Sequence, residues 1–301
     1  MGKATRVKRE NARERIAAQR AAARRAEIRN RMFIIGGSIL GVVAIVVAFV
    51  LVKTVGHSPA ASASSNSATG TALPASVIKD VTGVPASTLA SVGAGTAYAK
   101  SVSAVSAPPL TSAGKPEILY IGAQYCPYCA TERWALATAL SRFGTFSGLT
   151  GIHSAGSPEV YPNTPTLNFY KSSYSSKYLT FTAVEEQTVS KATLQVPTSQ
   201  QQALITKYDS PPYVAASSAG AIPFIDFGGK YLVHGAQFNP QLLQGQTWSQ
   251  VAAALADKSS AIGQGSDGAA NMITAAICKM TNNQPSTVCT TPTIKSMQGQ
   301  L

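Results

Sequence analysis

One stretch constrains the fold of this 301-residue chain more than any other. An apolar run, Ile118–Ile121, ends in a glycine-containing turn, and Cys126 and Cys129 follow with two residues between them. A helical pattern then starts at once, with apolar residues at 136, 140 and 143. A strand that leads into Cys-X-X-Cys at the start of an amphipathic helix is a redox-site signature.

The position of the two cysteines predicts their roles. A free thiol has a pKa near 8.5, but the unpaired N–H groups and the dipole at a helix N-terminus lower it to roughly 3.5–7.5. We therefore predict that Cys126, where the helix begins, is the attacking sulfur. Cys129 lies one turn later and resolves the mixed disulfide, and Pro127 suits the first helical turn.

Other uses of a Cys-X-X-Cys pair fit this sequence less well. A zinc site needs a second ligand pair, and the remaining cysteines, Cys278 and Cys289, have ten residues between them. A c-type haem needs histidine after the second cysteine, and position 130 is alanine. We predict neither a metal nor a cofactor. A purely structural disulfide between Cys126 and Cys129 stays open as an alternative.

The Cys-Pro-Tyr-Cys tetrapeptide resembles the active site of the thioredoxin superfamily. It has the form typical of glutaredoxins and is close to the Cys-Pro-X-Cys of DsbA-type oxidases. The resemblance implies a cis-proline that faces the cysteines, opens a strand and presents a backbone edge to an extended substrate segment. Ile222-Pro223 fits this role because a hairpin turn at Gly228-Gly229 follows. Thr164-Pro165 is the alternative candidate for the cis-proline.

The N-terminal part of the chain predicts a membrane anchor. Residues 1–31 carry eleven lysines and arginines against three glutamates, which is two thirds of the net charge of +12. Residues 32–52 carry no charge and as a helix would be about 31 Å long, enough to cross a bilayer. The basic excess puts residues 1–31 in the cytoplasm as a solvated arm, rather than in contact with nucleic acid. Cleavage near Ala61-Ser62-Ala63 is the minor alternative.

The rest of the chain then lies outside the plasma membrane. Residues 53–72, rich in serine, alanine, glycine and threonine, predict a flexible linker, and residues 73–301 predict one domain. Strand patterns cover 149–154, 165–170 and 178–184, and the last two read as a hairpin. Helices are expected after Pro74 and Pro85, from the capping boxes at Thr198 and Thr247, and from Ser266 onward.

Several single residues carry further predictions. Outside the cytoplasm, Cys278 and Cys289 are expected to form a structural disulfide, and a second redox-active pair is the alternative. Glu132, three residues after Cys129, is expected to be a surface carboxylate rather than a proton relay. His234 is expected to be a half-exposed strand histidine rather than a partner of the cysteines.

From about residue 86 to residue 289 the chain resembles a group of membrane-anchored, thioredoxin-like proteins catalogued as domain-of-unknown-function family 929. The matching runs are 108–116, 120–129 and 132–144, and the late cysteine pair fits too. The resemblance implies an α/β, thioredoxin-like fold with a helical insertion, preceded by one transmembrane helix. It says little about the substrate.

Together these observations predict a single-pass membrane enzyme that exchanges thiols and disulfides with extracytoplasmic proteins, as an oxidase or isomerase. Cys126 and Cys129 would be catalytic, Ile222 and Pro223 would hold substrate backbone, and a membrane redox partner would recycle the site. A reductase would need electrons delivered across the membrane. The alternative is a non-catalytic, disulfide-stapled binding module of the cell envelope.

Overall fold

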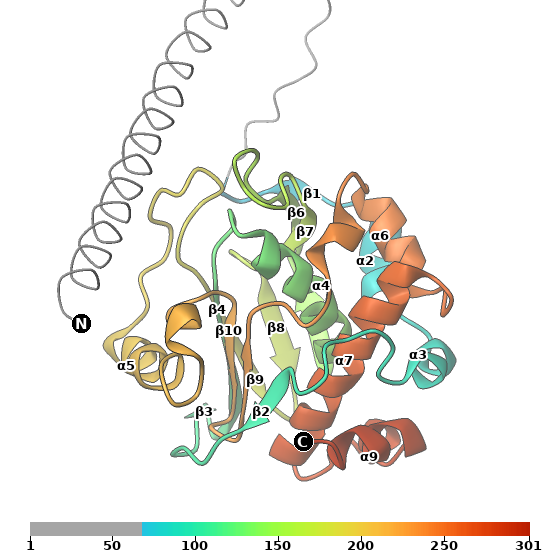
Figure 1. The fold of residues 1–301 in the computed structure, drawn as a ribbon. Helices are drawn as coiled ribbons and strands as arrows, with labels where there is room; N and C mark the ends of the chain where they lie inside the picture. Colours follow the sequence, from blue (N-terminus) through green and yellow to red (C-terminus); the bar gives the residue numbers. More distant parts are fainter. Residues whose placement is uncertain (1–67) are drawn as a thin grey trace, which may run out of the picture. The chain divides into compact units, whose positions relative to one another are not determined.

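A mixed β-sheet surrounds β4 (Lys115–Gly122), the strand that leads to the cysteine pair. The computed structural model describes residues 68–301. β4 pairs in parallel with β9 (Thr180–Glu185) and antiparallel with β10 (Phe224–Phe227), and it is largely buried because it lies between these neighbours. The described residues therefore form an α/β structure, as expected (Figure 1).

The sheet continues on either side of these three strands. β11 (Tyr231–His234) forms with β10 the hairpin predicted from Gly228-Gly229, and both glycines have positive φ, which the turn requires. β2 (Val102–Ala104) pairs with β11, and the short β3 (Thr111–Ser112) pairs with the first residues of β4.

The predicted hairpin between 165–170 and 178–184 is wrong. β7 (Pro165–Asn168) pairs with β6 (Thr150–His153), while the second run becomes β9 beside β4. An alternation of apolar and polar residues indicates a strand, but it does not determine which other strand pairs with it. The serine-rich segment between the two runs contains β8 (Ser173–Ser176), which pairs with β5 (Gly144–Ser147).

Residues before the predicted boundary at residue 73 already take part in strand pairing. β1 (Thr71–Ala72) pairs with β6, and the carbonyl of Ala68 accepts a hydrogen bond of 2.6 Å from the side chain of Gln124. The predicted linker, 53–72, therefore ends within the described residues. The composition of this segment does not indicate these contacts, because they use its backbone atoms rather than apolar side chains.

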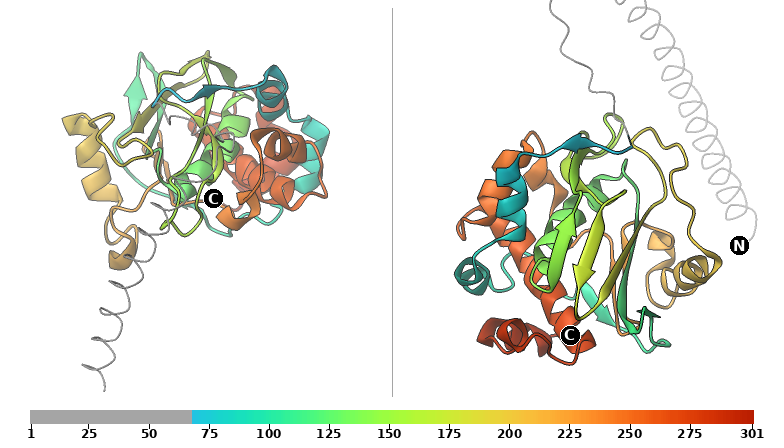
Figure 2. Two further views of the ribbon diagram at one scale, coloured as in Figure 1. Left: turned by 90° about the horizontal axis from the view of Figure 1, so that it is seen from above. Right: turned by 180° about the vertical axis from the view of Figure 1, so that it is seen from behind.

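Successive residues along the central strands face two different cores. One cluster includes Ile118, Tyr120, Ile225 and Phe227, and the other includes Leu119, Ile121, Phe224 and Leu232. Helices cover both faces: α4 (Pro127–Leu140) and α7 (Ala261–Met280) belong to the first core, and α5 (Ser199–Tyr208) packs against the second. Figures 1 and 2 show α5 on the opposite side of the strands from α4 and α7.

Helix α4 is not the amphipathic surface helix that its pattern indicated. Every residue from Pro127 to Leu140 except Tyr128 is buried. The helix packs against α7, α2 (Ala75–Thr82) and β7, so polar and apolar sides alike are covered. The apolar residues Leu136, Leu140 and Phe143 are buried, and Trp134 is among the largest fully buried side chains.

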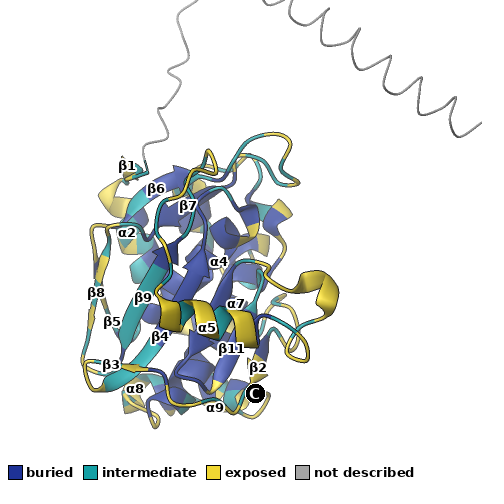
Figure 3. Ribbon diagram, turned by 90° about the vertical axis from the view of Figure 1, so that its left-hand side faces the viewer, coloured by how far each residue is buried: buried dark blue, intermediate teal, exposed yellow. Residues whose placement is uncertain are grey.

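The remaining helices agree with their sequence signals, with small shifts. Thr198 and Thr247 cap α5 and α6 (Trp248–Leu255) through complete capping boxes. Pro74 and Pro85 precede α2 and α3 (Ala86–Val92) as N-cap residues rather than first helical residues. Figure 3 shows α5 with an exposed outer face over buried strands.

The C-terminal region is helical and starts earlier than expected. α7 begins at Ala261, capped by the side chain of Ser260, instead of near Ser266. Two short helices follow it, α8 (Ser286–Cys289) and α9 (Pro292–Gln298). Two 3-10 turns, Ala216–Ser218 and Pro240–Leu243, complete the described elements.

The predicted tail at 1–31 and the predicted span at 32–52 lie outside the described residues. Between residues 68 and 301, none of the helices combines the length and the apolar character that crossing a membrane requires. The localisation of the chain therefore stays a prediction from its sequence.

Candidate functional site

Cys126 lies at the junction between the strand β4 and the helix α4. Its backbone is extended, with φ −77° and ψ 121°, so it is the N-cap residue, and Pro127 follows at the first helical position. Its sulfur accepts a hydrogen bond of 3.3 Å from the backbone N–H of Cys129. Both cysteines are free thiols. The sulfur thus occupies the position that a capping oxygen usually takes, where a negative charge is stabilised.

The two thiols differ in exposure and in acidity. Both cysteines are buried, but Cys126 keeps 5 % of its surface exposed, whereas Cys129 is fully buried. A hydrogen bond from the Cys129 side chain, backbone N–H groups and the charge of Arg133 lower the pKa of Cys126 against the effect of burial. Burial and the thiolate of Cys126 raise the pKa of Cys129 well above its ordinary value.

A buried ion pair lies beneath the cysteines. Nε of Arg133 donates to Oε1 of Glu185 at 2.9 Å, and Nη2 donates to Oε2 at 2.7 Å, with both side chains fully buried. Nη2 also donates to the carbonyl of Ala123, in the turn before Cys126, at 2.9 Å. The pair thereby ties the helix, the turn and the end of β9 together. Its charges act on the thiols at short range.

The ion pair of Arg133 and Glu185 was not predicted from the sequence. Arg133 follows Cys129 by one helical turn, which puts it on the same side of the helix. That spacing is the only local signal. Glu185 lies 52 residues further along the chain, and nothing local indicates that its strand runs beside β4.

The position of Glu132 differs from the prediction that it is a surface carboxylate. It is fully buried instead of lying on the surface, because α7 and the segment after β11 cover its side of α4. Oε2 accepts a hydrogen bond of 3.0 Å from the backbone N–H of Gln237, while Oε1 has no partner among the described residues. Burial raises the pKa of Glu132 to about 8. The carboxyl is therefore mostly protonated at neutral pH.

The structure brings Ile222 to the cysteine pair. The thiol of Cys126 donates to the backbone carbonyl of Ile222 at a Sγ···O distance of 3.6 Å. Pro223 follows, immediately before β10, and the Ile222–Pro223 peptide bond is cis. The rival Pro165 instead opens β7, where its carbonyl accepts a hydrogen bond of 3.0 Å from the ring of Trp134, and the bond before it is not cis.

Aromatic side chains surround the entrance to Cys126. Tyr128 is 39 % exposed, and its ring lies edge-on to that of Tyr161 at 5.9 Å between centroids. The amine of Lys191 lies 4.8 Å from the ring centroid of Tyr125 and 2.7 Å from a carboxylate oxygen of Glu159. Tyr128 belongs to the first turn of α4, and the other residues come from the turn before it and from two loops.

His234 does not join the site. It lies on β11, half-buried, with Nε2 3.0 Å from the carbonyl of Tyr208 and 3.9 Å from a carboxylate oxygen of Asp209. Burial lowers its pKa. It therefore connects the sheet to the end of α5. Between residues 68 and 301 no group of three or more His, Cys, Asp or Glu side chains is arranged to hold a metal ion.

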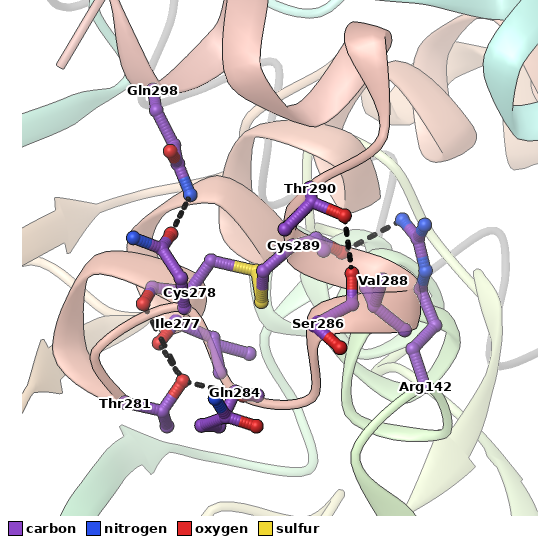
Figure 4. The surroundings of a disulfide bond; sticks show 12 residues. Arg142, Ile277, Cys278, Thr281, Gln284, Ser286, Val288, Cys289, Thr290 and Gln298 are labelled. Carbon is purple, nitrogen blue, oxygen red and sulfur yellow. Dashed lines mark hydrogen bonds between the residues drawn. A yellow bond between two sulfur atoms is a disulfide. The ribbon is translucent and has the colours of Figure 1, made fainter.

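Cys278 and Cys289 form a disulfide bond, with their Cα atoms 5.4 Å apart. The bond joins the last turn of α7 to the end of α8 (Figure 4). Both residues are buried. Neither lies at the start of a helix, so the pair lacks the setting that lowers the pKa of Cys126.

The family model for a domain of unknown function, DUF929, matches residues 101–279. That match spans more than half of the chain and includes the cysteine pair, the ion pair and Pro223. The chain therefore belongs to this family. No curated protein and no solved structure matches it.

Proposed function

We propose that this protein is a membrane-anchored, extracytoplasmic thiol–disulfide oxidoreductase that works through Cys126 and Cys129. The observation that carries the proposal is the contrast between the two thiols. Cys126 caps a helix, has a lowered pKa and is 5 % exposed, while Cys129 is fully buried and has a raised pKa. A structural cysteine has no need of this asymmetry, but a nucleophile and a resolving thiol do.

The arrangement of strands supports a thioredoxin-like fold. The order β9–β4–β10–β11, with the first pair parallel and the others antiparallel, matches the core sheet that the Cys-Pro-Tyr-Cys resemblance implies. Helix α4 follows β4 directly, and α5 lies between β9 and β10. The short strands β5–β8 form an addition between α4 and β9, and α5 is the candidate for the helical insertion expected before Pro223.

The proposed exchange has two steps. In the oxidising direction a substrate thiolate attacks Sγ of Cys126 in the Cys126–Cys129 disulfide, and the Cys129 sulfur leaves and takes up a proton. A second substrate thiolate then attacks the substrate sulfur of the mixed disulfide, and Cys126 leaves as a thiolate. The substrate loses two electrons and the enzyme gains them. The half-buried backbone of Ile222, beside Cys126, would pair with the substrate segment.

The acidity of Cys126 favours this direction over reduction. A stabilised thiolate is a better leaving group and makes the reduced dithiol the preferred form, so the pair gives up its disulfide more readily. The predicted location outside the cytoplasm points the same way. A membrane redox partner would reoxidise the pair between turnovers.

A redox titration of the full chain tests the proposal. Cys278→Ser with Cys289→Ser leaves only one titrating pair, and Cys126→Ser is the matched control. The chain is equilibrated with glutathione buffers, and the trapped thiols are counted by mass. We expect one pair to equilibrate above about −200 mV, as in oxidases and isomerases. A value near −270 mV would indicate a reductase, and no reduction short of about −300 mV would leave a non-catalytic binding module.

A further inference from the structure

A cavity of about 240 Å³ lies near the C-terminal end of α4. Cys126 begins the same helix, whose 14 residues span roughly 20 Å, so the cavity is separate from the cysteine site. Its walls come from α3, from the turn after α4, from α7 and from the α8–α9 region. Most of the side chains on these walls are aliphatic, among them Leu89, Val288 and Ile294.

Arg142 is the one charged side chain that lines this cavity. Its Nη1 donates to Oδ1 of Asn271 at 3.3 Å and to Oγ1 of Thr274 at 3.2 Å. Within residues 68–301 neither Nε nor Nη2 has an acceptor, and no carboxylate forms an ion pair with this guanidinium. Figure 4 shows Arg142 beside Val288, next to the disulfide.

The side chain of Arg142 is partly exposed, but it has lost part of its hydration and has no charged partner among residues 68–301. Burial alone lowers the pKa of Arg142 to about 10, and no negative charge offsets the effect. The group nevertheless remains protonated at neutral pH. Transfer of a cation out of water is unfavourable unless an anion or strong acceptors replace the lost hydration. An anion in the cavity would supply both.

The other residues that line the cavity indicate which class of anion it can bind. Thr287, an exposed residue of α8, also lines the cavity, and its hydroxyl makes no hydrogen bond among the described residues, so it can donate to a ligand. One cation and one hydroxyl suit a monoanion such as a carboxylate, which accepts two parallel bonds from a guanidinium. A phosphate dianion would lack a second cation. The aliphatic walls suit a short hydrocarbon tail.

We infer that this cavity binds a small organic carboxylate with a short aliphatic tail, held by Arg142 and Thr287. The disulfide supports the site, because Cys289 directly follows the wall residues Thr287 and Val288. The inference does not depend on thiol chemistry. It assigns a second, ligand-binding function to the C-terminal helices.

Calorimetric titration of the full chain with hexanoate near pH 7 tests the inference, and hexanamide is the uncharged control. We expect hexanoate to bind and hexanamide to bind at least about tenfold more weakly, because a charge-assisted pair is lost. Arg142→Gln should weaken hexanoate binding by a similar factor. Circular dichroism of this variant checks that it is folded.

A second variant keeps the test decisive if Arg142→Gln does not fold. Ala90 is an exposed residue of α3 that lines the cavity, so Ala90→Phe fills the space and leaves the arginine in place. It should abolish binding, while Cys126→Ser should bind hexanoate as the unchanged chain does. Equal binding of hexanoate and hexanamide, undiminished binding by either cavity variant, or no binding at about 10 mM hexanoate would each overturn the inference.

Discussion

The chain contains two cysteine pairs, and the first cysteine of each pair lies at an opposite end of a long helix. Cys126 begins α4, where N–H groups and the positive end of the dipole stabilise a thiolate. Cys278 lies in the last turn of α7, where the dipole has the opposite sign, and it is paired with Cys289. The position of a cysteine along its helix thus separates a thiol suited to exchange from one suited to a permanent bond.

The groups around the two cysteine pairs also differ, because those near the first pair are titratable and those that bond near the second are neutral. Arg133, Glu185 and Glu132 place buried titratable groups around the first pair. Around the disulfide, the bonds are made by neutral groups: the hydroxyl of Thr281 and the backbone N–H of Asn283 both donate to the carbonyl of Cys278. Buried charges cost stability, so their concentration at one pair indicates a function there.

The largest expected effect separates the pairs by activity. Cys126→Ser should slow the oxidation of a dithiol peptide at least about a thousandfold, because the attacking sulfur is lost. The matched variant, Cys278→Ser with Cys289→Ser, should stay within about twofold of the unchanged chain. Stopped-flow assays of peptide oxidation measure both. If Cys126→Ser oxidises the peptide as fast as the unchanged chain, the Cys126–Cys129 pair is not the catalytic one.

The next effect concerns pH and the buried carboxyl of Glu132. Its folded pKa of about 8 exceeds the ordinary 4.5, so its contribution is fully favourable below about pH 4.5 and is lost as the pH rises through 8. We expect stability to fall by at most about 3–5 kcal/mol between pH 5 and pH 9. Glu132→Gln should flatten that decline, measured by urea unfolding at several pH values. An unchanged slope in the variant would contradict the buried-acid explanation.

The disulfide should affect stability more than activity. Its cysteines are 11 positions apart, and the chain-entropy model predicts that opening this loop costs about 3 kcal/mol. Cys278→Ser with Cys289→Ser should therefore lower the melting temperature by several degrees. Cys126→Ser with Cys129→Ser is the control and should change it less, because those thiols are already free. Equal losses would show that both pairs are structural.

The smallest expected effect tests the ion pair beneath the cysteines. The charge of Arg133 lowers the pKa of Cys126. Arg133→Gln with Glu185→Gln removes both charges together and should raise that pKa by about half a unit to one unit. The rate of alkylation by iodoacetamide against pH reports the value. Arg142→Gln, which changes an arginine beyond the far end of α4, should leave the pKa of Cys126 unchanged. If the double variant also leaves that pKa unchanged, the ion pair does not affect the acidity of Cys126.

Local signals predicted the features that depend on a few neighbouring residues. The strand, turn and helix around Cys126, the capping boxes at Thr198 and Thr247 and the hairpin at Gly228-Gly229 all appear where they were expected. Each is stabilised by contacts between residues close in sequence. Short-range patterns therefore suffice to find them.

Contacts between distant segments could not be predicted in this way. The partner of β9 is β4 rather than the nearby 165–170 run, and β1 joins β6 across about eighty residues. Arg133 meets Glu185 only because that parallel pairing exists. Glu132 is buried because α7 packs on α4. Alternation and helical spacing identify an element but not the surface that will cover it.

The sequence by itself determined that two cysteines would meet at the start of a helix, since strand, turn, proline and helix follow one another within about twenty residues. Tertiary structure alone decided how those cysteines differ. It buried Cys129 completely, placed Cys126 beside the carbonyl of Ile222, and brought the ion pair of Arg133 and Glu185 to the site. The reason is physical: acidity and access depend on desolvation and on charges brought close in space, and both arise only when distant segments pack together.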